Sequence, residues 1–310
     1  MDAIYVGIDV SKDRLDVHVR PTGEAFAVAR DGKGLEILVK RLTVLAPTLI
    51  AVEATGGYET VVSAALAAAK LPVAVVNPAQ VRHFARAIGK RAKTDPIDAA
   101  VIAHFAEAAK PEPRIVPDEQ AQLLSDLVAR RRQIIEMIVA ERQREKRAVN
   151  RRLRKSIARL IAVLEKEITS VDTDIGDLVR GSPVWREKED LLISVPGIGT
   201  KTARTLLAEM PELGSLDRRR VASLAGIAPF TRQSGTWKGK SMIGGGRAPV
   251  RSALFICAMV AAKHNPLLRA FYQRLTTAGK PKMVALIAVA RKLLTILNAI
   301  LRDNKPWQPA

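Results

Sequence analysis

The sequence predicts an α/β domain at the N-terminus, then a long helical segment and a mostly α-helical C-terminal domain. In the first third of the 310-residue chain, short apolar runs typical of strands alternate with segments of helical periodicity. Residues 119–180 almost lack Gly and Pro, and the remainder is helical with Gly-rich interruptions. Because the Pro-rich stretch "KPEPRIVPDEQ" indicates a linker, we expect domains at 1–112, 113–182 and 183–310.

Five strands are expected in the N-terminal domain. "AIYVGIDV", "LDVHVR" and "EAFAVAR" are separated by turn-sized gaps, which favours an antiparallel meander. "TLIAVEAT" and "LPVAVVNP" each follow a segment of helical spacing, and further helices follow the last strand. Three strands, helix, strand, helix, strand, helix is the element order of the ribonuclease H-like fold, and we expect that fold here.

The charge of the chain points to a polyanionic partner. Lys and Arg total 50 against 31 Asp and Glu, a formal net charge of +19, which favours nucleic acid or an anionic membrane. A membrane protein is disfavoured because Arg291 and Lys292 interrupt the most apolar tract, 283–301. One Cys and four His exclude a zinc-finger layout. Since the opening "MDAIYVGIDVSK" has no signal-peptide pattern, we expect a cytoplasmic, nucleoid-associated protein.

The helical segment combines a basic half with an apolar seam. "ARRRQ", "ERQREKR" and "NRRLRKS" carry an excess of arginine, which favours helices that contact phosphates over a merely solvated face. Apolar residues then alternate in threes and fours, which predicts a coiled coil. A coiled-coil seam needs a partner helix, so we expect a homodimer. The seam consists of Leu153, Ile157, Leu160, Leu164, Ile168, Val171, Ile175 and Leu178.

Two carboxylates occupy apolar strands, where a charge is costly unless it is compensated. Asp9 and Glu53 each lie near the carboxyl end of a predicted strand, and ligand sites in α/β sheets open at such ends. Either acid could instead cap a loop or pair with a cation. Asp13 and Asp16 are weaker candidates, because Asp13 lies in a polar turn and Asp16 shares its strand face with His18.

Asp95 and Asp98 lie one helical turn apart at the start of a predicted helix. A structural explanation is available, with Asp95 as the N-cap, Pro96 in the first helical position and Asp98 in the first turn. Yet residues three apart share a helix face, so both carboxylates could reach one site. With Asp9 and Glu53 they would supply hard oxygen ligands for two Mg²⁺ ions, which clamp the attacking and leaving oxygens of a phosphodiester.

The C-terminal domain contains two motifs that could contact nucleic acid. "SVPGIGTKTA" has the pattern of a helix-hairpin-helix, whose glycines and Lys201 would face a phosphate, although a turn chosen only for packing has the same pattern. "RQSGTWKGKSMIGGGR" places Ser234 and Ser241 among cations in a glycine-rich loop. We expect residues 244–246 to give this loop flexibility and Arg247 to contact phosphate. By composition alone such serines are inert.

The motifs together resemble a known family. "GIDVSKDRLDV", "VEATGGYE", "VVNPAQVRHFA" and "KTDPIDAAVIA" are similar to the DEDD transposases of bridge-RNA-guided insertion sequences, which include the pilin-inversion recombinases. The C-terminal motifs "LAGIAPFTRQSG" and "GGGRAPVRSALF" resemble that family's last domain, most closely the branch whose elements carry subterminal inverted repeats. The resemblance runs through essentially the whole chain.

This resemblance implies a site and a set of partners. The catalytic, metal-binding tetrad of a RuvC-like domain falls at Asp9, Glu53, Asp95 and Asp98, with Mg²⁺ as the cofactor. The family's nucleophilic serine, which forms a covalent phosphoserine bond with DNA, falls at Ser234. Donor and target DNA, a structured guide RNA from the same element and a tetramer formed from two dimers are implied as partners. The expected nucleic-acid contacts are Arg130, Arg131, Arg132, Arg151, Arg152, Lys201, Arg232, Lys238, Lys240, Arg247 and Arg251.

Two other functions stay open at this point. A metal-dependent endonuclease that hydrolyses branched DNA, as Holliday-junction resolvases do, would use the tetrad and water, and Ser234 would be dispensable. A non-catalytic nucleic-acid binder is disfavoured because all four acidic positions of the motif are acidic in this sequence.

Overall fold

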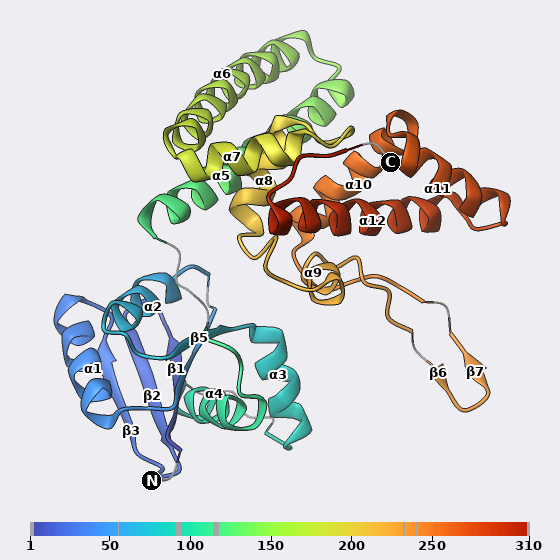
Figure 1. Ribbon diagram of the computed structural model, residues 1–310. Helices are drawn as coiled ribbons and strands as arrows, with labels where there is room; N and C mark the ends of the chain where they lie inside the picture. The colour runs from blue at the N-terminus through green and yellow to red at the C-terminus, as the bar shows by residue number, and fades with distance from the viewer. Residues whose placement is uncertain are drawn as a thin grey trace. The chain divides into compact units, whose positions relative to one another are not determined.

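The computed structural model confirms an α/β first part and a mostly helical remainder (Figure 1). The chain forms two compact units, Met1–Pro117 and Asp118–Ala310. The structure describes residues 3–54, 56–90, 95–113, 118–231, 233–239 and 241–308, without the side chains of 95–97, 237 and 238.

A five-stranded mixed sheet forms the centre of the first unit. β1 (Tyr5–Val10), β2 (Arg14–Arg20) and β3 (Ala25–Ala29) form the predicted antiparallel meander. β4 (Leu49–Glu53) and β5 (Val73–Val76) extend the sheet in parallel with β1, which gives the strand order β3-β2-β1-β4-β5. All five strands predicted from the sequence are therefore present.

Helices cover both faces of this sheet because the side chains of each strand alternate between the faces (Figure 1). One face packs its apolar side chains against α1 (Gly32–Leu45) and α2 (Glu59–Ala68). The opposite face packs against α3 (Pro78–Ala87) and α4 (Asp95–Ala109). The sheet is thus buried on both sides, and its strand ends form the edges at which polar residues can gather.

α4 lies directly on β1, and this close approach is possible because β1 has a glycine, Gly7, at the point of contact. A Cβ atom on Gly7 would lie 2.2 Å from the backbone nitrogen of Ala103 and 2.4 Å from the carbonyl oxygen of Ala99. Near the other end of the helix, Glu107 accepts a 2.6 Å hydrogen bond from Arg20, which lies opposite the first residue of β1. α4 therefore runs against the direction of β1, and its first turn lies at the carboxyl end of that strand.

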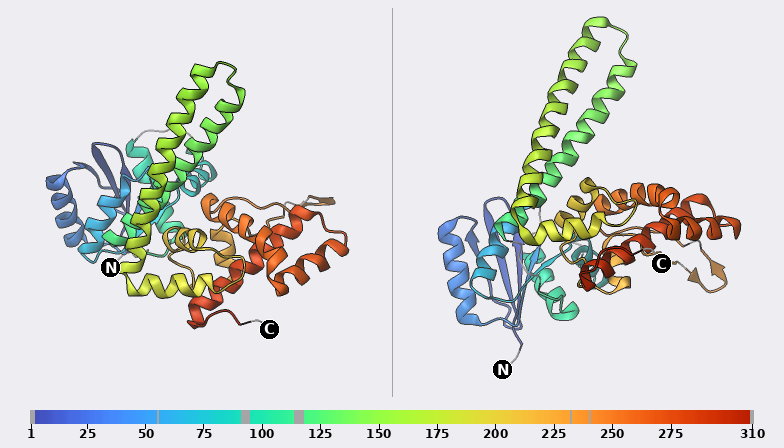
Figure 2. Two further views of the ribbon diagram at one scale, coloured as in Figure 1. Left: turned by 90° about the horizontal axis from the view of Figure 1, so that it is seen from above. Right: turned by 45° about the horizontal axis from the view of Figure 1, so that its top comes forward.

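The second unit begins with a helical hairpin of α5 (Glu119–Arg147) and α6 (Arg151–Gly181) (Figure 2). Much of the predicted apolar seam of α6 packs against α5 of the same chain, including Ile157, Val171 and Ile175. The sequence argument that this seam needs a helix from a second copy of the chain is therefore wrong, because α5 of the same chain covers most of it. Leu153 and Leu160 are the exceptions, with 53% and 46% of their surface exposed.

The rest of the second unit is one helical core with a protruding β-ribbon (Figure 1). α12, the last helix, is long and apolar enough to span a bilayer, but 44% of its apolar window is buried inside the unit, so packing explains its composition. The elements are α7 (Pro183–Ile193), α8 (Thr200–Glu209), α9 (Arg218–Leu224), the ribbon strands β6 (Gln233–Ser234) and β7 (Trp237–Lys238), α10 (Ala248–His264), α11 (Pro266–Thr277) and α12 (Lys282–Asp303).

The contact between α4 and β1 gives the first prediction. Gly7→Ala should lower the free energy of unfolding of the first unit by about 1–3 kcal/mol, because the added methyl group meets backbone atoms that no side-chain rotation can move. Gly32→Ala is the matched control, since a Cβ atom at that position would approach nothing within 4 Å. Urea unfolding measures both variants, and equal midpoints would contradict the close contact.

Candidate active site

Asp9 and Glu53 are neighbours at one edge of the sheet. β1 and β4 pair in parallel with Ile8 opposite Val52, so the next residues along the two strands come side by side. In a parallel pair, residues in register point to the same face, and here that is the face on which Gly7 meets α4. Both carboxylate residues are half-buried.

The first turn of α4 brings Asp98 to the same edge. Asp98 is half-buried and directly precedes Ala99, whose carbonyl approaches Gly7 two residues before Asp9. Asp95 begins the helix three residues earlier, but its side chain lies outside the described residues. Two strand ends and one helix start therefore place three of the four predicted acids at the same edge of the sheet.

The described carboxylates lie at one edge of the sheet but do not form a metal centre. Asp9, Glu53 and Asp98 each already have an interaction partner. In the part of the chain that is described, no three His, Cys, Asp or Glu side chains gather as metal ligands. The oxygen donors of these three side chains are of the kind that Mg²⁺ prefers.

Asp16 is a further acid next to Asp9. It is opposite Asp9 in the antiparallel register of β1 and β2, and only 6% of its surface is exposed. Arg14 compensates the charge, because its Nε donates a 2.9 Å hydrogen bond to Asp16 Oδ2. Sequence reasoning missed Arg14, although residues two apart in a strand share a face and an Arg-x-Asp pattern is the signal for such a pair. Asp13 is exposed.

Ser234 lies at the tip of the β-ribbon. It stands opposite Trp237, so a two-residue turn joins the two strands, and Gly235 adopts a positive φ of 56° there. Ser234 is exposed, whereas the hydroxyl of Ser241 lies 2.8 Å from that of Thr231 further down the ribbon. The geometry thus distinguishes the two serines, with Ser234 presented at the tip.

Glycines close the root of this ribbon by allowing two backbones to touch. A Cβ on Gly226 would lie 2.3 Å from the carbonyl oxygen of Gly245, and one on Gly246 would lie 2.4 Å from the nitrogen of Gly226. Phe230 and Met242 add a pair of backbone hydrogen bonds of 2.8 and 3.0 Å. Gly246 is therefore required for close packing, whereas a Cβ on Gly245 would meet nothing within 4 Å and only its φ of 65° favours glycine. The flexibility expected of residues 244–246 stays a prediction.

Arg247 holds the same root through ion pairs. Its Nη1 and Nη2 donate to the two carboxylate oxygens of Glu212 at 2.6 and 2.7 Å, and Nη1 also donates to the carbonyl of Glu209 at 2.8 Å. Arg251 donates a 2.6 Å hydrogen bond to the carbonyl of Gly245. Both side chains were predicted to contact nucleic acid, but in this structure their guanidinium groups fasten the ribbon to the helical core.

The other predicted nucleic-acid contacts fall into two groups. Arg131 pairs with Asp172 and Arg132 with Glu209, so these two arginines act as struts inside the second unit. Burial raises the pKa of Asp172, but hydrogen bonds and charges from Arg131 and Lys201 lower it overall. The second group is exposed at the surface and consists of Arg130, Arg151, Arg152 and Lys201. Arg232, Lys240 and the side chain of Lys238 lie outside the described residues.

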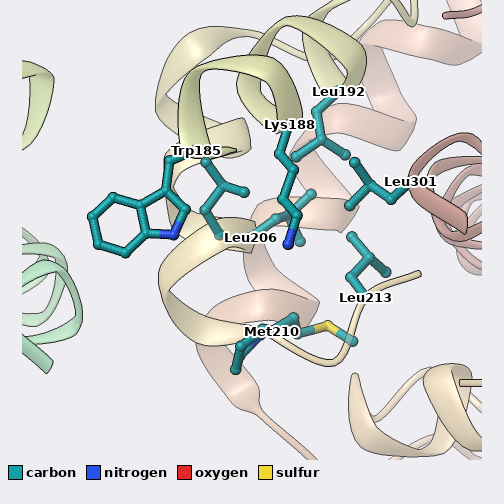
Figure 3. Close-up of a pocket in the computed structure, with 9 residues that line it drawn as sticks. Trp185, Lys188, Leu192, Leu206, Met210, Leu213 and Leu301 are labelled. Atoms are coloured by element: carbon teal, nitrogen blue, oxygen red, sulfur yellow. The ribbon is translucent and has the colours of Figure 1, made fainter. Parts of the chain in front are cut away.

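A small cavity of about 50 Å³ between α7, α8 and α12 is unsuited to catalysis (Figure 3). Its lining is mostly apolar, with Leu192, Leu206 and Met210 among the side chains that face it. Lys188 is the one ionisable residue of the lining, so the cavity offers neither paired carboxylates nor a nucleophile. The candidate reactive groups lie instead at the sheet edge and on the ribbon.

The second prediction concerns the root of the ribbon. Glu212→Gln should destabilise the second unit by about 1.5–3 kcal/mol, the range for hydrogen bonds to charged groups, and should speed tryptic cleavage within the ribbon. Asp303→Asn is the matched control, because the Arg302–Asp303 pair is exposed and such pairs contribute little. If urea unfolding and digestion do not distinguish the two variants, the root is not held by this ion pair.

Comparisons with known proteins identify the family of this chain. Residues 6–155 match the transposase family model DEDD_Tnp_IS110, and residues 189–273 match the model of the transposase IS116/IS110/IS902 family. The pilin gene-inverting protein of Moraxella bovis is 30% identical over 318 residues, which cover 99% of this chain and 98% of that protein. The 42 kDa protein of insertion element IS900 from Mycobacterium paratuberculosis is 32% identical over 166 residues, 49% of this chain and 40% of that protein. The chain therefore belongs to the IS110/IS116/IS902 family of DEDD-type transposases, enzymes that cleave and rejoin DNA.

Proposed function

We propose that this insertion-sequence transposase is an RNA-guided recombinase that uses a Mg²⁺-dependent carboxylate site and Ser234 as its nucleophile. The observation that carries the proposal is the pairing of two features. Acids from β1, β4 and α4 share one edge of the sheet, and an exposed serine lies at the tip of a ribbon whose root is fixed. A hydrolytic nuclease needs only the first feature.

We assign the first unit to the ribonuclease H-like, RuvC-like class. The support is its strand order of β3-β2-β1-β4-β5, with an antiparallel meander extended by two parallel strands and helices on both faces. In that arrangement Asp9 and Glu53 end adjacent strands and Asp95 and Asp98 start the helix that covers them.

The tetrad Asp9, Glu53, Asp95 and Asp98 would hold the metal. When bound, Mg²⁺ would polarise the scissile phosphate and neutralise the charge that develops on it. The chain's own contribution is to hold the carboxylates on rigid elements, since α4 is fixed on β1 by backbone contact at Gly7. Arg14 keeps Asp16 neutralised beside Asp9, which limits the competition of this fifth acid for the ion.

Ser234 would supply the nucleophile. Its oxygen forms a bond to the phosphorus of the scissile phosphodiester as the bond from phosphorus to a deoxyribose oxygen breaks. The serine proton leaves to solvent, and the departing deoxyribose oxygen takes up a proton. One phosphate ester replaces another, so reversal by a hydroxyl of a different strand rejoins DNA without an external energy source. Ser234 and the carboxylates belong to different units, so the proposed reaction needs a unit of each kind at the scissile phosphate. The family resemblance suggests that these units come from different subunits.

The helical hairpin is the proposed surface for the guide RNA and for DNA phosphates. Arg130, Arg151 and Arg152 are exposed on it, and phosphate contacts of this kind give binding that weakens as salt rises. The guide RNA itself is implied by the family resemblance. Leu153 and Leu160 remain exposed on α6 and are the proposed contacts of a homodimer, two of which would form the active tetramer. Such a complex would work on DNA in the cytoplasm, associated with the nucleoid.

The metal site gives the third prediction. Asp98→Asn should reduce strand cleavage by about 100-fold or more, because the loss of a metal ligand removes several kcal/mol of transition-state stabilisation. Binding to DNA should stay near that of the wild type, since the basic surface is unchanged. Asp13→Asn, which changes an exposed acid in a turn, is the matched control and should cleave normally. Asp95→Asn should behave like Asp98→Asn. Cleavage by either variant at the wild-type rate, or by the wild type in excess chelator, would refute the metal site.

The nucleophile gives the fourth prediction. Ser234→Ala should bind DNA and RNA normally but form no covalent protein–DNA adduct on a nicked substrate and no recombinant product. Ser241→Ala should still form the adduct, because that hydroxyl contacts Thr231 away from the tip. Denaturing electrophoresis after trapping measures both variants. An adduct with Ser234→Ala, or only free cut ends with the wild type, would favour hydrolysis by the carboxylate site alone.

A further inference from the structure

We propose that an apolar groove between α10 and α12 binds a nucleobase that has left the base stack of the DNA near the scissile phosphate. The place of this base along the DNA rests on the function proposed for Ser234. The capacity of the groove to hold an unstacked base does not rest on that function, and the first experiment below tests it without cleavage.

The groove lies where α10 and α12 pack side by side in the second unit (Figure 1). It is open to solvent and has a volume of about 350 Å³, within the range of about 300–1,000 Å³ that is typical of ligand pockets. α10 contributes Ser252, Phe255 and Ile256, whose spacing of three and four residues places them on one helix face. α12 contributes Met283 and Ile287, one helical turn apart. The lining is therefore mostly apolar and belongs to two rigid elements.

Folding of the second unit does not require these apolar side chains. The same two helices bury other residues in the helical core, among them Leu254 and Val289, which are fully buried. Ile256 and Met283 instead leave 58% and 60% of their surface exposed. Because exposed apolar side chains that line a groove gain free energy when a ligand removes them from water, this lining indicates a ligand with an apolar face.

The charge of the segment around the groove identifies the kind of ligand. Residues 218–302 contain 16 Lys and Arg and no Asp or Glu, although 31 of the chain's 310 residues are acidic. All residues that line the groove belong to this segment. A second copy of the chain would bring its own net charge of +19 to this surface, and like charges oppose such a contact. Nucleic acid combines the required features, since its phosphates are anionic and its unstacked bases present apolar faces.

The individual side chains of the groove fit a base. Phe255 provides an aromatic ring on which a base of any kind can stack, and the hydroxyl of Ser252 can donate to or accept from a base edge. Arg251 completes the polar part of the lining. Its Nη1 donates to the carbonyl of Gly245 at 2.6 Å, which fixes the guanidinium at the groove, and a guanidinium has five N–H donors in all. Arg251 can thus stay anchored while it contacts a phosphate next to the base.

The groove adjoins the serine ribbon, residues 230–242. Ile243, which directly follows the ribbon, lines the groove. Met242 and Phe230 pair at the root, and Ser234 lies four residues beyond Phe230, which is at most about 14 Å along an extended chain. A strand at the ribbon tip can therefore place a neighbouring base in the groove. This proximity to the proposed nucleophile favours DNA over the guide RNA as the source of the base.

The first experiment compares single-stranded with double-stranded DNA in the presence of a chelator, so that no strand is cut. Phe255→Leu removes the aromatic ring but keeps an apolar side chain. Its affinity for a single-stranded oligonucleotide, measured by fluorescence anisotropy, should fall by about 5-fold or more, the effect of losing one stacked base. Its affinity for a fully paired duplex of mixed sequence should stay near that of the wild type, because paired bases do not reach the groove and the phosphate contacts are unchanged.

Two further variants control for folding and for exposed apolar surface. Ile256→Gln changes an exposed wall of the groove and should also weaken single-strand binding, with an unchanged thermal midpoint. Val184→Gln is the matched control, because Val184 on α7 is also 58% exposed but does not line the groove, and it should bind as the wild type does.

Three results of this experiment would overturn the proposal. The first is an unchanged single-strand affinity of Phe255→Leu, and the second is an equal loss of affinity for both kinds of DNA. The third comes from light scattering on the same samples. If the groove variants change the oligomeric state but not single-strand binding, the groove is an interface between protein chains.

The second experiment locates the base. Cleavage in Mg²⁺ first maps the scissile phosphate, and the fluorescent base 2-aminopurine, which is quenched while it is stacked, then replaces single bases on either side of it in a duplex. The wild-type protein should brighten one or two positions, and Phe255→Leu should not. A mismatch opposite such a position should tighten binding by the wild type alone, because that base is already unpaired. Equal brightening by the two proteins, or none at any position, would overturn the placement in DNA.

The outcomes separate this site from the proposed chemistry. If Ser234→Ala still forms the covalent adduct while Phe255→Leu loses single-strand affinity, the groove stands as a base site and only the serine assignment fails. If Phe255→Leu loses affinity for single-stranded RNA and no position of the DNA brightens, the base comes from the guide RNA and the DNA proposal is wrong.

Discussion

The backbone contact between α4 and β1 is the constraint on which the carboxylate edge depends. A helix can approach a strand this closely only where the strand lacks a side chain, and Gly7 provides that place. The ion pair of Arg20 with Glu107 fixes the opposite end of the helix. With both ends fixed, the first turn of α4 must lie at the carboxyl end of β1, where Asp9 is located. The position of the acidic residues at this edge is therefore a consequence of the packing of α4 on β1.

The serine ribbon is positioned by other means, since it has no core of its own. Gly226 and Gly246 allow the two ends of the ribbon to come into backbone contact. Arg247 links one of these ends to the carboxylate of Glu212 and the carbonyl of Glu209. This arrangement lets a short ribbon project from the helical core while its root stays fixed. An exposed hydroxyl at the tip is then presented at a defined place, which a loose glycine-rich loop could not achieve.

The arginines of this chain occur in two settings. Arg14, Arg131 and Arg247 compensate carboxylates that the fold has partly or fully buried, and removing either partner would leave the other charge unpaired. The hairpin arginines and the first turn of α9 remain at the surface. A partly buried carboxylate partner distinguishes the structural arginines from those at the surface.

Local patterns in the sequence were sufficient to predict all five strands, the helices between them and the positions of the acids at strand and helix ends. They were sufficient because alternation, helical periodicity and capping residues act over a few neighbouring residues. Three features depended on tertiary packing: the α6 seam packs on α5, Arg247 is a strut, and Gly226 and Gly246 allow close backbone contact. Periodicity shows which face of a helix is buried but not what covers it. Likewise, the partner of Arg247 lies 35 residues away in the sequence, where no local pattern can identify it.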